Sequence, residues 1–414
     1  MILCLLLIEI SIDFEKDGKM ICMTQFSNSK PNTDSSSASV SDVSLSEKDF
    51  IRVFSRIFRF SQKPLLSGSE HDDCAAIQLS SFCTDLSAES LTFSTDTVRE
   101  SADFPKSMTF WQKGWMAAAV NLSDLAAMGS KPVAFLFSAG LPPRFTLSDA
   151  EQLARGIQEC VSFFGAEVIG GDTEFSEELT ITGTVIGISE NKSLLLRKNA
   201  KSGDLLCVTG SSGSAGVALS VLLDENNHVP ASDSFLKNLT EPFPRVFEGM
   251  MLSKIGAVTS MIDTSDGLAS SVYELSSLSG VCFEIDSDSL LNAADAEAFQ
   301  ILKSQNQSHS DCSDFETRFL SEALYTGGDF ELLFTISPDK LNHVKEAFQN
   351  FNSSYNGCFD NLSSAGKSGR FPCSFTVIGK AIAESENVIL TQSGSSKNRQ
   401  LLLKKGYDSF KKYI

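Results

Sequence analysis

Apolar and polar residues along this chain follow two periods. Three segments predict helices. Residues 50–58 carry apolar side chains at helical spacing, and residues 114–129 are rich in Ala, Leu and Met. Residues 146–164 lie between a Thr146 cap and Gly165. Shorter apolar runs predict strands at 91–97, 132–141, 166–172, 178–189, 205–210, 260–263, 331–336 and 375–382. Strands that alternate with helices indicate an α/β fold with α+β layers.

Length and composition suit two domains. The chain has 414 residues, of which 42% are apolar. We expect an N-terminal domain over 47–190 and a C-terminal domain over 191–414, with insertions near 291–318 and 351–370. Residues 27–46 are a serine-rich linker, and the apolar residues 1–10 are too short to span a bilayer and lack signal-peptide flanks. We expect 1–46 to be a disordered or mis-assigned N-terminal extension.

The excess of acidic residues limits the kinds of partner that the chain is expected to bind. Acidic residues outnumber basic ones by 52 to 34, a formal net charge of −18, which argues against nucleic acid or an anionic membrane. The ten cysteines form no CxxC pair, and neither they nor the four histidines have zinc-like spacing. We therefore expect reduced cysteines, a cytoplasmic location and no zinc site.

The segment 114–129 contains two polar residues in apolar surroundings. Asn121 and Asp124 are three positions apart and share one helix face. A carboxylate in such a place is costly unless a cation or hydrogen-bond donors compensate it. A pairing with an arginine or a helix cap would be the structural explanation.

Oxygen-bearing side chains also gather where predicted strands end. They are Asp72, Asp73, Ser94, Thr95, Asp96, Asp172 behind Gly170 and Gly171, Asp263, Ser265 and Asp266. Each has a structural alternative, such as turn chemistry or a polar strand edge. Together they suit a hard cation such as Mg²⁺, which prefers oxygen ligands.

Carboxylates that converge on one site repel one another unless a positive charge compensates them. Several Mg²⁺ ions that carry a polyphosphate supply that charge, which predicts metal-assisted phosphoryl transfer without a protein nucleophile. The chain has no P-loop, because Asn361 stands where AGKS at 365–368 would need the first Walker A glycine. The glycine loop at 210–216 opens a helix and is able to hold an anion, but its irregular pattern favours a structural role.

Six ordered blocks resemble the thiamine-monophosphate kinase family of the aminoimidazole-ribonucleotide-synthetase superfamily: STDTVRESADFP, NLSDLAAMGSKP, VIGGDT, RKNAKSGD, IDTSDGLA and GGDFELLFT. The resemblance extends from residue 47 to 410, apart from the two insertions. It implies a two-domain PurM-like fold whose N-terminal domains pair through their sheets into a homodimer. It also implies ATP- and Mg²⁺-dependent phosphorylation of thiamine monophosphate to thiamine diphosphate by direct in-line transfer.

The resemblance implies roles by position. The implied magnesium ligands are Asp73, Ser94, Thr95, Asp96, Asp124, Asp263 and Asp266. The implied ATP contacts are Gly171, Asp172, Arg197 and Ser265, with Arg155 as a further candidate. The implied catalytic residues are Asp96, Asp124 and Arg197, and the implied substrate contacts are Asp103, Gly328 and Tyr407, of which Tyr407 stacks on the rings of the substrate.

The chain departs from the family at several positions. His71 replaces the glycine of a GDD motif, and Met116 a basic residue. On the acceptor side Asp103 and Gly328 replace a histidine and a glutamate. Two alternatives therefore stay open: another ATP-dependent synthetase of the superfamily, acting on an amide or on selenide, and a nucleotide-binding protein that has lost catalysis. The selenide case is disfavoured because no reactive cysteine lies in an N-terminal glycine-rich loop.

Overall fold

The computed structural model describes residues 89–190, 193–224, 231–305, 313–355, 373–382, 387–392 and 398–407. Nearer the N-terminus it describes short pieces only: helical residues 53, 54, 56 and 57, and the strands β1 (Asp13–Phe14), β2 (Met20–Ile21), β3 (Leu65–Ser67) and β4 (Ala76–Ile77). None of the helices in these ranges is long and apolar enough to cross a membrane.

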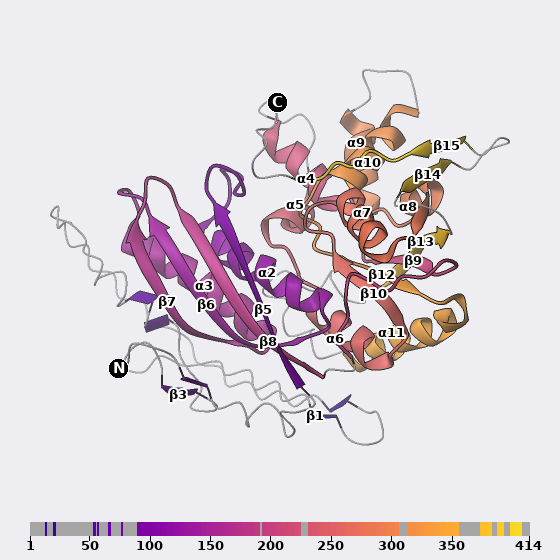
Figure 1. Ribbon diagram of the computed structural model, residues 1–414. Coiled ribbons are helices and arrows are strands. Elements are labelled where there is room, and N and C mark those ends of the chain that lie inside the picture. Colours follow the sequence, from indigo (N-terminus) through magenta and orange to yellow (C-terminus); the bar gives the residue numbers. More distant parts are fainter. Residues whose placement is uncertain are drawn as a thin grey trace.

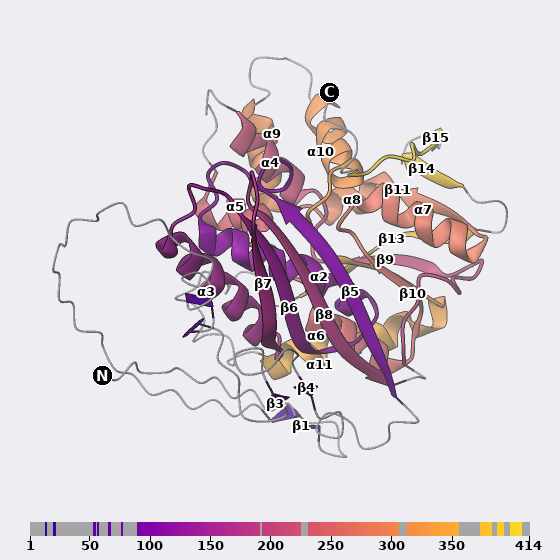
Figure 2. The same cartoon turned by 60° about the vertical axis from the view of Figure 1, so that its left-hand side comes forward.

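The N-terminal half is a four-stranded sheet with helices on one face (Figures 1 and 2). Its strand order is β5-β8-β6-β7, with β8 antiparallel to both neighbours and β6 parallel to β7. The strands and helices are β5 (Glu89–Arg99), β6 (Lys131–Leu141), β7 (Glu167–Phe175), β8 (Thr180–Glu190), α2 (Phe110–Ala127) and α3 (Leu147–Phe163). Side chains that alternate along these strands pack against α2 and α3.

Helix α2 is the central element of this half. Thr109 starts it with a capping box, in which Thr109 Oγ1 accepts from Gln112 N and Gln112 Oε1 accepts from Thr109 N. Most of its side chains are buried, as the apolar segment predicts. Gly129, with a φ of +66°, follows its C-terminus.

Glycines allow α2 to approach its neighbours closely. A Cβ on Gly114 would overlap the carbonyl oxygen of Leu153, and a Cβ on Gly156 would overlap that of Trp111. On another side of α2, a Cβ on Gly249 would overlap Ala126 O. Backbone-to-backbone packing of this kind excludes even an alanine.

The C-terminal half is a seven-stranded sheet of order β10-β12-β9-β13-β11-β14-β15. The strands are β9 (Leu205–Thr209), β10 (Val258–Asp263), β11 (Cys282–Asp286), β12 (Leu332–Ile336), β13 (Phe375–Ile382), β14 (Val388–Gln392) and β15 (Asn398–Leu401). The helices are α4 (Ser214–Leu223), α5 (Asp233–Thr240), α6 (Val246–Ile255), α7 (Leu268–Ser279), α8 (Ser287–Asn292), α9 (Ala296–Gln305), α10 (Ser313–Tyr325) and α11 (Leu341–Tyr355), with a 3₁₀ turn η2 (Pro338–Lys340).

One hydrophobic core joins the two halves. It includes Leu122 and Leu125 of α2, Phe247 and Leu252 of α6, and Phe334 of β12. Trp115 is 1% exposed and donates from Nε1 to the carbonyl oxygen of Pro242 at 2.7 Å. Helix α6 and strand β10 of the C-terminal half both pack directly on α2.

The predicted helices and strands are confirmed where the structure describes them, and the predicted buried cysteines Cys160, Cys207 and Cys282 are buried. The segment 291–318, predicted as a polar insertion, contains α9 and the start of α10. Its Ala298, Ile301 and Leu302 are buried in a second core. Residues 356–370, like Cys74, lie outside the described ranges, and the domain boundary near residue 190 stays a prediction.

Candidate functional site

Strand β5 presents two predicted site residues to helix α2. Ser94 and Asp96 lie on the strand face that alternates with the exposed Leu91 and Phe93. Ser94 Oγ donates a short hydrogen bond to Asp124 Oδ2. The backbone N–H of Asp96 donates to Asn121 Oδ1 at 2.9 Å. The polar pair in α2 therefore docks the strand: Asn121 holds the backbone and Asp124 holds the serine.

Asp263 of the C-terminal half meets the same turn of α2. It ends β10, is 3% exposed, and its Oδ2 accepts a 2.7 Å hydrogen bond from Ser123 Oγ. Ser265 Oγ donates to its other oxygen at 3.2 Å. Asp124 and Asp263 thus lie at the same turn, although Asp124 belongs to helix α2 of the N-terminal half and Asp263 to strand β10 of the C-terminal half.

The closeness of these groups shifts their pKa values. Burial, and then the charge of Asp124, raises the pKa of Asp263 to about 7, against hydrogen bonds from Ser123 and Ser265 and the positive charge of Arg197. Burial, followed by the charges of Asp124, Asp266 and Asp103, raises the pKa of Asp96 to about 6. Burial also raises the pKa of Asp124, although Ser94 and Arg197 oppose it.

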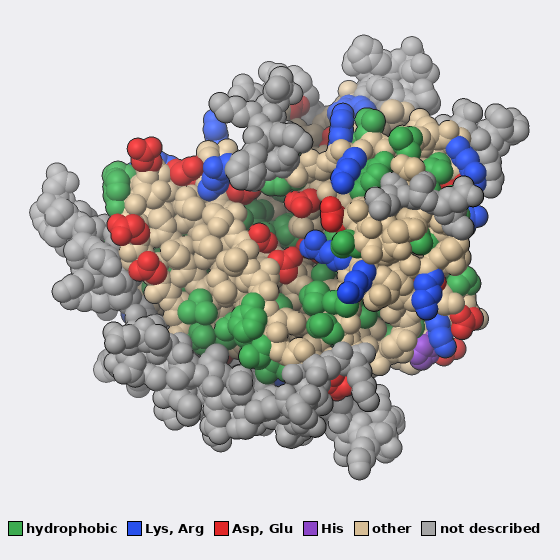
Figure 3. Space-filling view, viewed as in Figure 1, with side chains coloured by type: hydrophobic (Ala, Val, Ile, Leu, Met, Phe, Trp, Pro, Cys, Tyr) green, Lys and Arg blue, Asp and Glu red, His purple; other side chains and the backbone are tan. Residues whose placement is uncertain are grey.

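These carboxylates form an acidic cluster at the junction of the two halves. Figure 3 shows acidic side chains gathered along the junction of the two halves, with basic side chains beside them. In the described part of the chain, no three His, Cys, Asp or Glu side chains already form a metal cage. Mg²⁺ typically binds through one or two carboxylates, several waters and substrate phosphates. The mutual repulsion of these oxygen ligands therefore fits Mg²⁺ that is shared with a polyphosphate.

The structure does not bring the Thr95 hydroxyl into this group. Thr95 Oγ1 donates to Gly183 O at 2.7 Å and accepts from Thr184 Oγ1 at 3.1 Å. Neighbouring residues in a strand point to opposite faces, so the hydroxyl lies on the face away from α2. The role of Thr95 as a magnesium ligand stays a prediction, and its hydroxyl lies on the other sheet face from Ser94 and Asp96.

Gly171 and Asp172 also lie apart from Asp96, Asp124 and Asp263. Asp96, Gly183, Phe137 and Gly171 occupy one row across the sheet. Three strand spacings separate Asp96 from Gly171, roughly 14 Å. A Cβ on Gly171 would overlap the Phe137 ring, and both Gly171 and Asp172 are exposed on the edge strand β7. The nucleotide role of these two residues stays a prediction.

Two other candidates are placed differently. Arg155 forms a 2.7 Å ion pair with Glu151 along the exposed side of α3. Asp73, like His71 and Asp72, lies outside the described residues, so its role as a ligand stays a prediction.

The predicted acceptor-side residues come together. Tyr407 Oη donates to Asp103 Oδ1 at 2.7 Å, and the backbone N–H of Tyr407 donates to Asp266 O at 2.9 Å. Gly328 N donates to Ser265 O at 2.9 Å. Gly328 has a φ of +103°, a conformation that strains any side chain, so glycine suits this turn better than the glutamate of the family.

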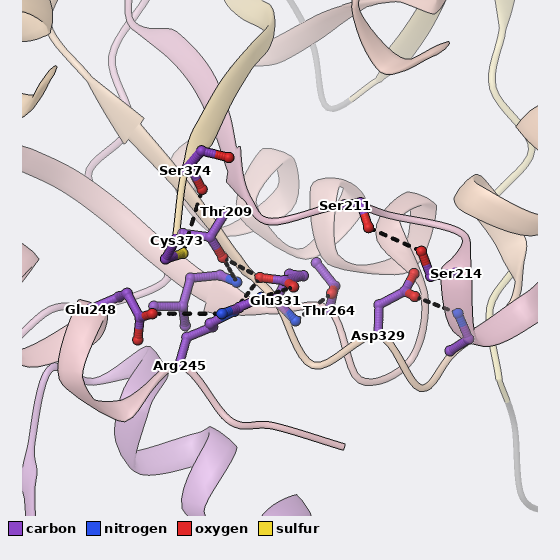
Figure 4. Close-up of polar contacts among 12 residues, drawn as sticks. Thr209, Ser211, Ser214, Arg245, Glu248, Thr264, Asp329, Glu331, Cys373 and Ser374 are labelled. Atoms are coloured by element: carbon purple, nitrogen blue, oxygen red, sulfur yellow. Dashed lines mark hydrogen bonds and ion pairs between the residues drawn. The ribbon is translucent and has the colours of Figure 1, made fainter. Parts of the chain in front are cut away.

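A buried ion-pair network behind the site was not predicted from the sequence (Figure 4). Arg245 at the start of α6 donates to both oxygens of Glu331, at 2.7 and 2.6 Å. Thr209 Oγ1 donates to the same carboxylate at 2.6 Å. The backbone of Glu331 makes two hydrogen bonds with Thr264. Its N–H donates to Thr264 Oγ1 at 3.1 Å, and its carbonyl oxygen accepts from Thr264 N at 2.9 Å. The network thereby anchors the residue next to Asp263. The sequence signal that could have indicated this network is a glutamate at the start of an apolar strand.

The glycine loop before α4 already holds a carboxyl group of the chain itself. Asp329 accepts hydrogen bonds from Ala215 N at 2.9 Å and Gly213 N at 2.6 Å. Its carboxylate thus occupies the position that an external anion would take at the helix N-terminus. This arrangement supports the structural role that the irregular glycine pattern favours.

Comparison with known proteins shows which families and proteins this chain is similar to. The AIR synthase related protein N-terminal domain model matches residues 71–189, and the C-terminal domain model matches residues 201–355. Thiamine-monophosphate kinase of Methanospirillum hungatei is 37% identical over 273 residues, which covers 66% of this chain and 82% of that protein.

Solved structures of thiamine-monophosphate kinases have the same fold as this chain. Thiamine-monophosphate kinase from Stenotrophomonas maltophilia aligns with a TM-score of 0.61 and 25% identity, covering 83% of this chain and 94% of that one. A structure described as AaThiL complexed with AMPPCP and TMP shares the fold, with a TM-score of 0.59 and 24% identity, covering 76% of this chain and 88% of that one.

The fold and the acidic site define a two-domain PurM-like protein of the AIR-synthase-related class. Within that class, the chain belongs to the thiamine-monophosphate kinase family.

Proposed function

We propose that this enzyme transfers the γ-phosphoryl group of ATP to thiamine monophosphate, giving thiamine diphosphate and ADP. The observation that carries the proposal is the convergence of Asp96, Asp124 and Asp263 on one turn of α2, at the junction of the two halves. Family membership supports the choice of donor and acceptor.

The site fits Mg²⁺ through oxygen ligands. We assign Asp96, Asp124, Asp263 and Asp266 as the carboxylates that hold it, with Ser94 beside Asp124 and with Asp73 as a candidate from the sequence. When bound, Mg²⁺ neutralises the phosphate charge that develops during transfer. Ser123 and Ser94 keep two of these carboxylates aimed at the junction.

The chain supplies position and charge rather than a nucleophile. The acceptor is a phosphate monoester whose second pKa is about 6, so its oxygen is largely ionised at neutral pH and needs no general base. Arg197 lies close enough to influence Asp124 and Asp263. We assign it to neutralise the transferred phosphoryl group, as an arginine does in other phosphoryl-transfer sites.

A coupled assay of ADP release tests the proposal. Purified full-length protein is mixed with ATP, Mg²⁺ and thiamine monophosphate, and thiamine diphosphate is quantified by chromatography. We expect ADP and thiamine diphosphate in equal amounts. ATP binding without turnover on thiamine monophosphate would instead support a nucleotide-binding protein that has lost catalysis, the second candidate that the changes at Asp103 and Gly328 favour. Turnover only with a different acceptor would support another synthetase of the superfamily.

We also propose a homodimer through the outer face of the N-terminal sheet. Leu91 and Phe93 are 41% and 64% exposed on this face, and a separate apolar cluster that includes Leu136, Ile169 and Ile186 lies in the same sheet. An apolar sheet face of this kind marks an interaction surface. Sedimentation should show a dimer that Phe93→Asp dissociates. Leu223→Asp, at an equally exposed leucine that ends α4, should leave it intact.

A further inference from the structure

One hydrogen bond joins the two halves on the acceptor side. Tyr407 Oη donates to Asp103 Oδ1 at 2.7 Å, across 304 positions of sequence. The second carboxylate oxygen of Asp103 accepts from Arg99 N at 2.8 Å. Both oxygens are therefore engaged, and the carboxylate is held in one orientation at the end of β5.

Tyr407 is equally fixed from its own side. Its backbone N–H donates to the carbonyl oxygen of Asp266, a residue whose carboxylate belongs to the acidic site. A Cβ on Gly327 would lie 3.3 Å from Tyr407 Cβ and would overlap Ser265 O. A Cβ on Gly406 would overlap Asp266 O. The tyrosine therefore packs tightly on the turn that carries Asp263 and Asp266.

We propose that Asp103 and Tyr407 form an interdomain clasp that orients the Tyr407 ring and selects an acceptor with a cationic aromatic ring. The inference rests on the proposed function, because thiamine monophosphate carries a positively charged thiazolium and a negatively charged phosphate. The phenol hydroxyl bond fixes the ring plane, whose face attracts a cation. The Asp103 carboxylate attracts the thiazolium and repels the phosphate, so the ring end of the acceptor is held at Asp103 and the phosphate end is directed away from it.

Tyr407→Phe separates the clasp from simple ring stacking, because it keeps the ring and removes the hydroxyl. We expect the KM for thiamine monophosphate to rise about 10-fold, the scale of a lost hydrogen bond to a charged group, with the KM for ATP unchanged within about twofold. An unchanged KM for thiamine monophosphate would show that the ring works without the hydroxyl and would overturn the clasp.

Tyr273→Phe is a matched control. Tyr273 Oη donates to Leu402 O at 2.6 Å, so this variant loses a similar hydrogen bond beneath the same C-terminal segment. We expect lower thermal stability and an unchanged KM. If Tyr273→Phe raised the KM as Tyr407→Phe does, general loosening of the segment would explain both effects, and the clasp would fall.

A double-mutant cycle tests whether the two residues act together. We expect Asp103→Ala to raise the KM for thiamine monophosphate, and Tyr407→Phe to add little in the Asp103→Ala background, because the bond is already broken. Fully additive effects would overturn the pairing.

Asp103→Asn tests the charge, because it keeps an oxygen acceptor for Tyr407 but removes the carboxylate. The neutral thiazole phosphate 4-methyl-5-(2-phosphoethyl)thiazole serves as a competitive inhibitor. We expect the preference for thiamine monophosphate over this compound to fall about 10-fold, the order of a lost close charge pair in a partly buried site. An unchanged preference would overturn the charge selection.

Hydrogen exchange without substrate separates the clasp from the proposed function. We expect faster exchange of residues 99–103 in Tyr407→Phe and of residues 402–407 in Asp103→Ala, each in the half that was not mutated. Unchanged exchange in both variants would overturn the clasp even if the kinase assay succeeds. If exchange changes but thiamine monophosphate is not turned over, the clasp stands and the proposed function falls.

Discussion

Ser123 in helix α2 donates a 2.7 Å hydrogen bond to Asp263 at the end of strand β10. The next residue, Asp124, accepts from Ser94 of strand β5. Two consecutive residues of one helix thus contact site residues of both sheets, Asp263 in one and Ser94 in the other. The site depends on this turn of α2, and the closely packed neighbours of the helix keep it in place.

Ser123→Ala should weaken the site while leaving the fold intact. Asp263 loses a donor that favours its charged form, and we expect kcat/KM to fall roughly 10-fold, a typical cost of one hydrogen bond to a buried carboxylate. Steady-state kinetics over a Mg²⁺ titration measure it. The control is Ser130→Ala, because the buried Ser130 hydroxyl has no hydrogen-bond partner within the described ranges. Equal losses in both variants would refute a specific role for Ser123.

Asp124→Asn should abolish turnover without unfolding the protein, because it removes charge and leaves volume nearly unchanged. Turnover is measured by ADP release, and folding by circular dichroism and thermal melting. Asp233→Asn, at an exposed position in the first turn of α5, should retain full activity. If Asp124→Asn keeps near-normal turnover, the metal role assigned to Asp124 is wrong.

Arg245→Met should destabilise the fold strongly. It leaves Glu331, 5% exposed, and the fully buried Glu248 without their cation. Breaking a buried pair in this way typically costs about 3–5 kcal/mol of unfolding free energy. Urea denaturation measures the loss. Arg155→Met removes the exposed pair with Glu151 and should cost no more than about 1 kcal/mol; a similar loss in both variants would contradict the importance of burial.

Asp329 should make stability depend on pH. Burial raises its pKa from 3.8 to about 7, although the Gly213 and Ala215 N–H groups oppose the shift, and Glu331 and Glu322 add to it. Because the folded state favours the protonated form, its contribution to stability is fully present below about pH 4 and is lost as pH rises through about 7. The carboxylate is therefore least favourable to the fold above that pH.

Asp329→Asn removes this titration. We expect the free energy of unfolding of the variant, relative to wild type, to increase from pH 4 to 7 and then to stay level, on top of a constant cost for an impaired helix cap. Urea denaturation without Mg²⁺ at several pH values measures the difference. A constant difference across this range would show that Asp329 does not titrate as stated.

Gly156→Ala should destabilise the contact between α2 and α3, because the new Cβ would overlap Trp111 O. Overpacking of this kind typically costs about 1–3 kcal/mol. Thermal and urea denaturation measure it. Gln152→Ala, on the exposed side of the same helix, should change stability by less than about 0.5 kcal/mol. If Gly156→Ala left the free energy of unfolding unchanged, the two helices would be able to move apart without loss of stability.

Sequence patterns predicted the elements of the fold and the residues that meet at α2. The apolar segment 114–129 predicted a buried helix, and its two polar residues predicted a functional face. The roles differ, however. Asn121 is fully buried, its Oδ1 accepts from the Asp96 backbone and its Nδ2 donates to Ala117 O, whereas Asp124 faces the acidic site. Spacing along a helix identifies a shared face but does not identify the partners across it.

Thr95 and Asp172 show what one-dimensional patterns leave open about position in space. Both follow apolar strand residues, as Asp96 and Asp263 do. Thr95 points to the opposite sheet face, and Asp172 lies on the edge strand, three strands from β5. The order of strands in a sheet depends on long-range pairing, which local hydrophobic period does not encode.

The sequence by itself determined the helices and strands, the acidic character of the site and the family, because local periodicity, charge and ordered motifs are written along the chain. Only the tertiary structure decided which polar side chains meet: Ser123 with Asp263, Arg245 with Glu331, and Tyr407 with Asp103. These contacts join residues at least 86 positions apart. Their partners are set by how two sheets pack around one helix, a property of the whole core rather than of any segment.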